Sequence, residues 1–65
     1  MSFDIRRIPL EIINLAAELT SGRIDGWTKE GIRNRLEKIK DEPGQDTDIQ
    51  NYINWVLYKN EKQYE

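Results

Sequence analysis

The sequence predicts an all-α fold, a small three-helix bundle with an N-terminal arm, as a single helical domain over residues 1–65. Three observations favour this fold class. Apolar residues recur at helical spacing in three segments, two clusters of turn-forming residues separate these segments, and no stretch alternates apolar and polar residues like a strand. The core must be thin, because so short a chain buries only about 60% of the surface that it exposes when unfolded.

The first predicted helix spans about residues 9–20. Pro9 suits the first helical position, where its missing N–H would have no partner. At about 100° per residue, Glu11, Asn14 and Glu18 fall on one narrow polar stripe. The apolar residues cover the remaining arc of roughly 220°, whereas a helix in a three-helix bundle needs only about 160°. The sequence therefore predicts surplus apolar surface on this helix.

The second predicted helix spans about residues 28–40 and has Thr28 as its N-cap. Trp27 would then precede the cap and Ile32 would be the fourth helical residue, which is the pairing of a hydrophobic staple. Trp27 is therefore expected to be structural, so that its loss would lower thermal stability and spare partner binding. The apolar seam that starts at Ile32 is only about 60° wide. This width predicts a helix at the periphery of the bundle.

The third predicted helix spans about residues 47–60, after a break at Pro43 and Gly44. Thr47 and Gln50 stand in the relation of a capping box at its start. Its apolar residues repeat at helical spacing, and aromatic residues gather toward one edge of this face. Residues 61–65 are expected to form a frayed tail.

Residues 1–8 are predicted to form the N-terminal arm. Phe3, Ile5 and Ile8 are apolar, and we expect them to lie over the bundle. A short strand that pairs with the edge of a partner is the alternative, because Phe3 and Ile5 alternate with polar neighbours.

The composition excludes several classes of function. The chain contains no Cys and no His, so it has no disulfide, none of the usual zinc ligands and no side chain for the common thiol and histidine mechanisms. Carboxylate pairs such as Glu30 with Glu37 lie in charged sequence rather than in apolar sequence. Asp46 and Asp48 are spaced like the first two ligands of a calcium loop, but the pattern fails after them, which favours a turn and a helix cap. We predict no enzyme, no catalytic residue, no cofactor and no metal site.

The N-terminus superficially resembles a signal peptide, because Arg6 and Arg7 precede an apolar run. Glu11, Asn14 and Glu18 interrupt that run, and no stretch approaches the roughly 20 apolar residues of a membrane span. We therefore expect a soluble, cytoplasmic protein without membrane contact. The net charge of −2 and the pI of about 5.1 provide no global positive field that would attract nucleic acid or anionic lipid.

The most informative predicted surface is an aromatic strip on the third helix, where large rings lie next to ammonium groups. Such a composition favours protein interfaces. With the surplus surface of the first helix, this strip supplies the candidate partner-binding residues, which are Tyr52, Trp55, Tyr58, Lys59, Lys62, Ile12, Leu15 and Leu19. The alternative is that Tyr52 and Trp55 only close the bundle. We predict a small non-enzymatic protein–protein interaction or regulatory module that binds another protein, or itself as a homodimer.

A small nucleic-acid-binding regulator of the helix-turn-helix type is the alternative function. Phosphate contacts would come from basic residues of the arm, the first loop and the second helix, namely Arg6, Arg7, Arg23, Lys29, Arg33 and Lys40. The segment 21–27 is longer than the three or four residues of the tight turn in that motif. Glu30, Glu37 and Asp41 also place negative charge on the face of the second helix that would enter a DNA groove. Nucleic-acid binding is therefore the weaker hypothesis.

Overall fold

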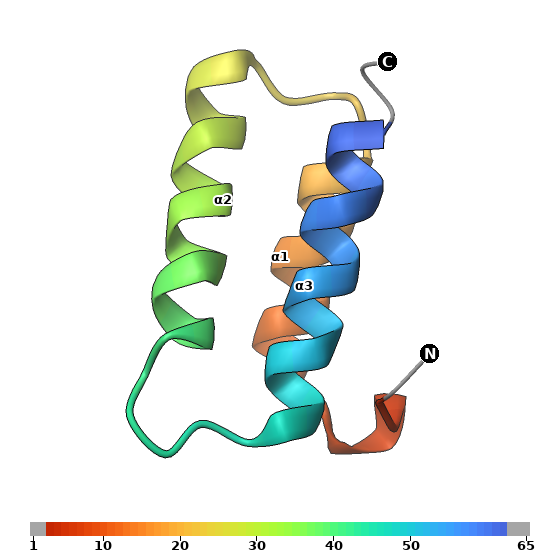
Figure 1. Cartoon of the computed structure of the whole chain (residues 1–65). Helices are drawn as coiled ribbons and strands as arrows, with labels where there is room; N and C mark the ends of the chain where they lie inside the picture. The colour runs from red at the N-terminus through yellow and green to blue at the C-terminus, as the bar shows by residue number, and fades with distance from the viewer. Residues whose placement is uncertain (1–2, 63–65) are drawn as a thin grey trace.

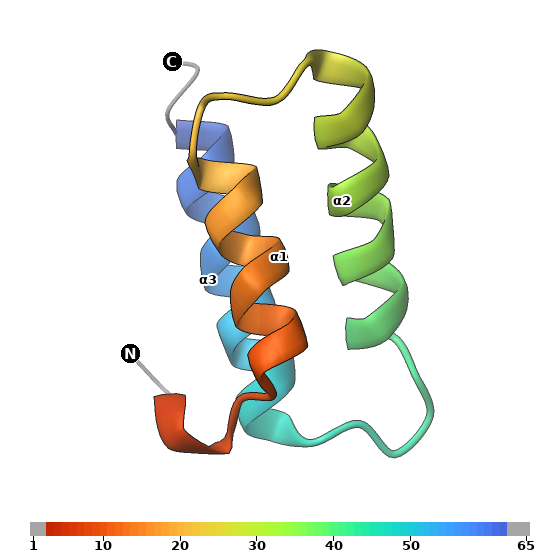
Figure 2. The same ribbon diagram turned by 180° about the vertical axis from the view of Figure 1, so that it is seen from behind.

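The expected all-α fold is confirmed by the structure, a computed structural model that describes residues 3–62 and the side chains of residues 3–60. A short 3-10 turn, η1 (Ile5–Arg7), precedes three helices: α1 (Leu10–Thr20), α2 (Gly26–Lys40) and α3 (Thr47–Lys62). Figures 1 and 2 show α1 and α3 running side by side in the same direction, with α2 antiparallel to both. Every helix contacts the other two. Residues 3–62 contain no strand, so the alternative of a short strand in the arm is wrong.

One hydrophobic core lies between the three helices. Its ten buried residues come from the arm, α1, α2 and α3, and are Ile8, Ile12, Ala16, Leu19, Ile32, Leu36, Tyr52, Ile53, Val56 and Leu57. Only two of them belong to α2, which agrees with the narrow apolar seam of that helix. Because α2 buries so little, most of its surface faces away from the bundle.

The surplus apolar surface expected on α1 is distributed differently from the prediction. Ile12 and Leu19 are buried in the core, so their assignment to a partner-binding surface is wrong. Leu15 is half-buried against the core, whereas Leu10 is 69% exposed. Ile12 and Leu19 are buried because α1 packs against both α2 and α3, and Ile8 of the arm belongs to the same core.

The structure begins α2 at Gly26, two residues before the predicted start. Its N-cap is Asp25, so the prediction of Thr28 as the N-cap is wrong. The Asp25 carboxylate Oδ1 accepts a hydrogen bond from the Thr28 backbone N–H at 2.7 Å, and this bond lowers the pKa of Asp25. Aspartate ranks above threonine as an N-cap. Ile24 therefore precedes the cap and packs against the core, whereas Trp27 is 89% exposed and makes no hydrophobic staple.

The capping box predicted from Thr47 and Gln50 is also wrong. Asp46 caps α3, since its Oδ1 accepts a hydrogen bond from the Asp48 backbone N–H at 2.8 Å. The Gln50 side chain instead donates to the Lys40 carbonyl at 3.4 Å, near the end of α2. The predicted tail also begins too early, because α3 continues to Lys62. The rest of that tail lies outside the described residues.

The arm lies over the bundle, as predicted. Ile8 is buried in the core, and the Phe3 ring packs against α3. Arg7 adds polar contacts, because its guanidinium lies 3.0 Å from the Asp46 carboxylate and 3.6 Å from that of Asp48. The arm is therefore connected to the beginning of α3 by both apolar and ionic contacts.

Candidate functional site

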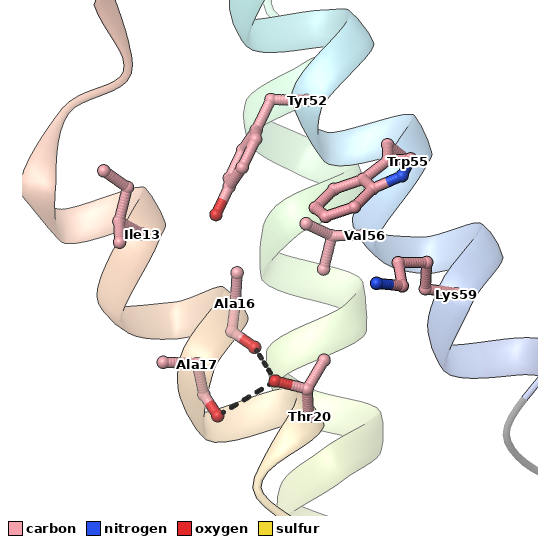
Figure 3. A pocket seen from close by; sticks show the side chains of 8 residues that line it. All are labelled: Ile13, Ala16, Ala17, Thr20, Tyr52, Trp55, Val56 and Lys59. Atoms are coloured by element: carbon pink, nitrogen blue, oxygen red, sulfur yellow. Dashed lines mark hydrogen bonds between the residues drawn. The ribbon is translucent and has the colours of Figure 1, made fainter. Parts of the chain in front are cut away.

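The candidate site is a groove of about 250 Å³ between α1 and α3. The residues that line it come from these two helices and are Ile13, Ala16, Ala17, Thr20, Tyr52, Trp55, Val56 and Lys59. Figure 3 shows the α1 side chains on one wall and the α3 side chains on the other. Because α1 and α3 run side by side, the groove follows their common direction.

Small side chains on α1 leave this space open. Ala16 and Ala17 present only methyl groups to the groove. Thr20 turns its hydroxyl back onto its own helix, where Oγ1 donates to the carbonyls of Ala16 at 3.1 Å and Ala17 at 3.3 Å (Figure 3). Its methyl group is therefore the part of the side chain that remains for apolar contacts in the groove. The α1 wall therefore consists of short, apolar groups, and its Thr20 hydroxyl is already used in hydrogen bonds to α1.

Aromatic rings build the opposite wall. The Tyr52 and Trp55 ring centroids are 6.2 Å apart, and Phe3 of the arm packs edge-on against Tyr52 with a centroid distance of 5.2 Å. Phe3 also contacts Trp55, at 5.6 Å. Burial raises the pKa of the Tyr52 phenol above its ordinary value, because the charged phenolate would lose its hydration there. The three rings restrain one another, and the wall is therefore preorganised.

One cation marks the rim of the groove. The Lys59 ammonium Nζ lies 4.5 Å from the centroid of the Trp55 ring, which is the geometry of a cation–π interaction (Figure 3). No carboxylate belongs to the residues that line the groove. Among the described residues that line the groove, the others are uncharged and Lys59 carries one positive charge. These electrostatics favour a ligand that has a negatively charged group beside an apolar part.

The structure brings part of the predicted aromatic strip into this groove. Tyr52, Trp55 and Lys59 line it, whereas Tyr58 is 58% exposed outside the lining. The side chain of Lys62 lies outside the described residues. Tyr52 also belongs to the core, so it closes the bundle and lines the groove at once.

Sequence reasoning missed the α1 wall of the groove. Ile13, Ala17 and Thr20 lie on it, but the prediction chose other α1 residues. The available signal was three small side chains on one face of the helix, since Thr20 follows Ala16 and Ala17 by about one turn. Small side chains indicate a groove only when the neighbouring helix is known to place large aromatic rings opposite them.

The basic residues of the nucleic-acid hypothesis belong to separate elements of the chain. Arg6 pairs with Asp4 at 3.1 Å, which lowers the pKa of Asp4, and Arg7 pairs with Asp46 and Asp48. Arg6 and Arg7 lie in the arm, whereas Arg23 lies in the loop between α1 and α2, at the opposite end of the bundle (Figure 1).

The remaining cations of that hypothesis belong to α2. Arg33 donates from Nη1 to the Asn60 carbonyl oxygen Oδ1 at 3.0 Å. Lys29 and Lys40 are half-buried near the two ends of the helix. The six cations thus belong to the arm, the α1–α2 loop and α2, and part of their charge is neutralised within the chain.

In the part of the chain that the structure describes, no three His, Cys, Asp or Glu side chains form a group that could hold a metal ion. Among the described helices, none is both long and apolar enough to cross a membrane.

Comparison with known proteins identifies no relative: no family model, no curated protein and no solved structure matches this chain.

Proposed function

We propose that the chain is a non-enzymatic protein-interaction module, and that it binds an apolar segment of another protein in the groove between α1 and α3. One observation carries this proposal. The groove has a wall of restrained aromatic rings, and Trp55 remains only half-buried there although tryptophan is highly buried on average. Tryptophan and tyrosine are the residues on which binding energy concentrates at protein interfaces.

The chemistry of the groove defines the segment that would fit. A large apolar side chain of the partner would fill the space above Ala16 and Ala17 and cover the exposed edge of Trp55. A carboxylate one or two turns away would pair with Lys59 at the rim. A helix or an extended strand with this pattern would lie along the common direction of α1 and α3. A cytoplasmic partner fits a chain that contains no Cys.

The proposal is tested with short random peptides displayed on phage and selected against the wild-type chain. We expect the selected peptides to share a large apolar residue and an acidic residue. Replacing Trp55→Ala should weaken their binding at least about tenfold, because it removes the main apolar anchor. Ala17→Arg should do the same by filling the groove, and Lys59→Glu should discriminate against the acidic peptides.

The matched control is Tyr58→Ala, which removes an exposed aromatic ring of α3 that does not line the groove. This variant should bind the selected peptides like the wild type. Peptides that bind the Trp55→Ala and Ala17→Arg variants as tightly as the wild-type chain would refute the groove as the docking site. Circular dichroism of each variant establishes that the helices are retained.

A further inference from the structure

The arm places one aromatic ring against the aromatic wall of the groove without entering the groove. The Phe3 ring centroid lies 5.2 Å from that of Tyr52 and 5.6 Å from that of Trp55. Tyr52 and Trp55 both line the groove, whereas Phe3 does not. Phe3 therefore contacts the wall from outside the groove, and a partner segment in the groove would not need to touch it.

The arm has attachments to the bundle other than Phe3. Ile8 is buried in the core, and the Arg7 guanidinium lies 3.0 Å from the Asp46 carboxylate, directly before α3. The Arg7 backbone N–H donates to the Asp4 carbonyl at 2.9 Å, which closes the η1 turn. Phe3 directly precedes this turn, so an anchored segment presents its ring to α3.

Trp55 is the ring of the wall whose orientation depends most on such a contact. Tyr52 is buried in the core, whereas Trp55 is only half-buried and borders the open space of the groove. Lys59 also contacts the indole, at 4.5 Å, but it is exposed and its four-carbon stem is flexible. The Phe3 ring is rigid and comes from another element, so it limits the rotation of the indole more strongly.

We propose that Phe3 is a positioning residue of the groove, and that docking of the arm and binding of a partner segment strengthen each other. This inference rests on the proposed function of the groove. Phe3 holds the Trp55 indole in the orientation that the apolar side chain of the partner covers. A side chain that is already ordered loses less entropy when the partner binds, which increases affinity. Because coupling between two binding equilibria is reciprocal, the partner must stabilise the docked arm by the same factor.

The peptides selected against the wild-type chain are the probe for this coupling, and titration calorimetry measures their affinity. Phe3→Ala should weaken their binding about threefold to tenfold, which corresponds to the loss of one aromatic contact. Phe3→Tyr keeps the ring and should restore most of this affinity. Unchanged binding of Phe3→Ala overturns the proposal. Tighter binding overturns it as well, because the arm would then obstruct the groove.

Two control variants separate positioning from stability. Ile5→Ala removes a side chain of the same arm that is 51% exposed, and should leave the peptide affinity unchanged. Ile32→Val shortens a buried side chain of α2, a helix that contributes no residue to the groove. It should lower the stability of the fold without lowering the affinity. If either control weakens binding as much as Phe3→Ala does, the positioning role of Phe3 is wrong.

A measurement without any peptide tests the orientation of Trp55. Trp27→Phe leaves Trp55 as the single tryptophan of the chain. In that background, Phe3→Ala should reduce the tryptophan band of the near-ultraviolet circular dichroism spectrum and shift the Trp55 emission to longer wavelength. The helical signal in the far-ultraviolet spectrum should remain. Trp55 spectra that do not respond to Phe3→Ala overturn the proposal.

Proteolysis tests the reciprocal effect on the arm. Trypsin cleaves after arginine once a segment opens locally, so cleavage after Arg6 and Arg7 reports undocking of the arm. A saturating concentration of a selected peptide that lacks Lys and Arg should slow this cleavage in the wild type but not in Phe3→Ala. Equal protection of both chains would mean that the peptide stabilises the whole fold, which overturns the coupling. A wild-type arm that gains no protection overturns it too.

The groove and the role of Phe3 fail in different ways. If no peptide binds the groove, the proposed function fails and the coupling fails with it. If peptides bind and depend on Trp55, but Phe3→Ala changes neither their affinity nor the Trp55 spectra, the groove remains the docking site and only the role of Phe3 is refuted.

Discussion

Asn60 shows how a single polar side chain connects the three helices. Its side chain is fully buried. The amide Nδ2 donates to the Leu19 carbonyl near the end of α1 at 3.4 Å, and Oδ1 accepts from Arg33 of α2 at 3.0 Å. The described part of the chain leaves no buried side-chain nitrogen or oxygen atom without a hydrogen-bond partner. Sequence reasoning could not identify this role, because an asparagine near a helix end is ordinarily exposed and its partners lie on two distant elements.

Replacing Asn60→Ala should destabilise the fold by about 1–3 kcal/mol, because the Leu19 carbonyl and the Arg33 guanidinium lose a buried partner. Urea denaturation monitored by circular dichroism measures this change. Asn54→Ala is the matched control, since Asn54 is exposed on the same helix and should change the stability by less than about 0.5 kcal/mol. Equal effects of the two substitutions would contradict the proposed role of Asn60.

At the scale of the helices, the sequence predicted all three with ends accurate to about two residues. Periodic apolar residues and the breaks around Gly22 and Pro43 were sufficient for this. The N-caps of α2 and α3 were wrong because each of these two helix starts offers two competent capping residues. Asp25 lies three residues before Thr28, and Asp46 directly precedes Thr47. N-cap propensity alone does not decide between the two residues. The choice also depends on which apolar residue near the cap then packs against the core.

The Asp25 cap predicts a pH-dependent contribution to stability. Asp25→Ala should lower the Tm by several degrees at pH 7, whereas Thr28→Ala should have a smaller effect. The Thr28 N–H lowers the pKa of Asp25 in the folded chain, so the stabilisation is present above the unfolded pKa of about 4 and is lost as the pH falls through the lowered value. The Tm difference between wild type and Asp25→Ala should therefore disappear in strong acid. A larger loss for Thr28→Ala at pH 7 would restore Thr28 as the cap.

At the scale of the whole molecule, the groove was only half predictable. The ring spacing along α3 indicated one wall, since helical periodicity places Tyr52, Trp55 and Lys59 on one strip. The other wall depends on how α1 lies against α3, and residues about 40 positions apart in sequence meet there. The apolar surplus on α1 was recognised, but its buried and exposed parts could not be separated without the positions of the arm and α2.

The attachment of the arm gives a prediction about the whole fold. Ile8→Ala should destabilise the chain by about 2–5 kcal/mol, because it leaves a cavity in a thin core. Arg7→Ala should cost less than about 1 kcal/mol, since its guanidinium is 62% exposed and its ion pairs are screened by water. Thermal denaturation of both variants measures the ratio. A larger loss for Arg7→Ala would mean that the ion pairs, rather than the apolar contacts, hold the arm.

The position of α2 behind the groove has a consequence for labelling the chain. None of the residues that line the groove belongs to α2, and Figure 3 shows the α2 ribbon passing behind the space between α1 and α3. A label attached to the outer face of α2 would therefore leave the groove open to its partner segment.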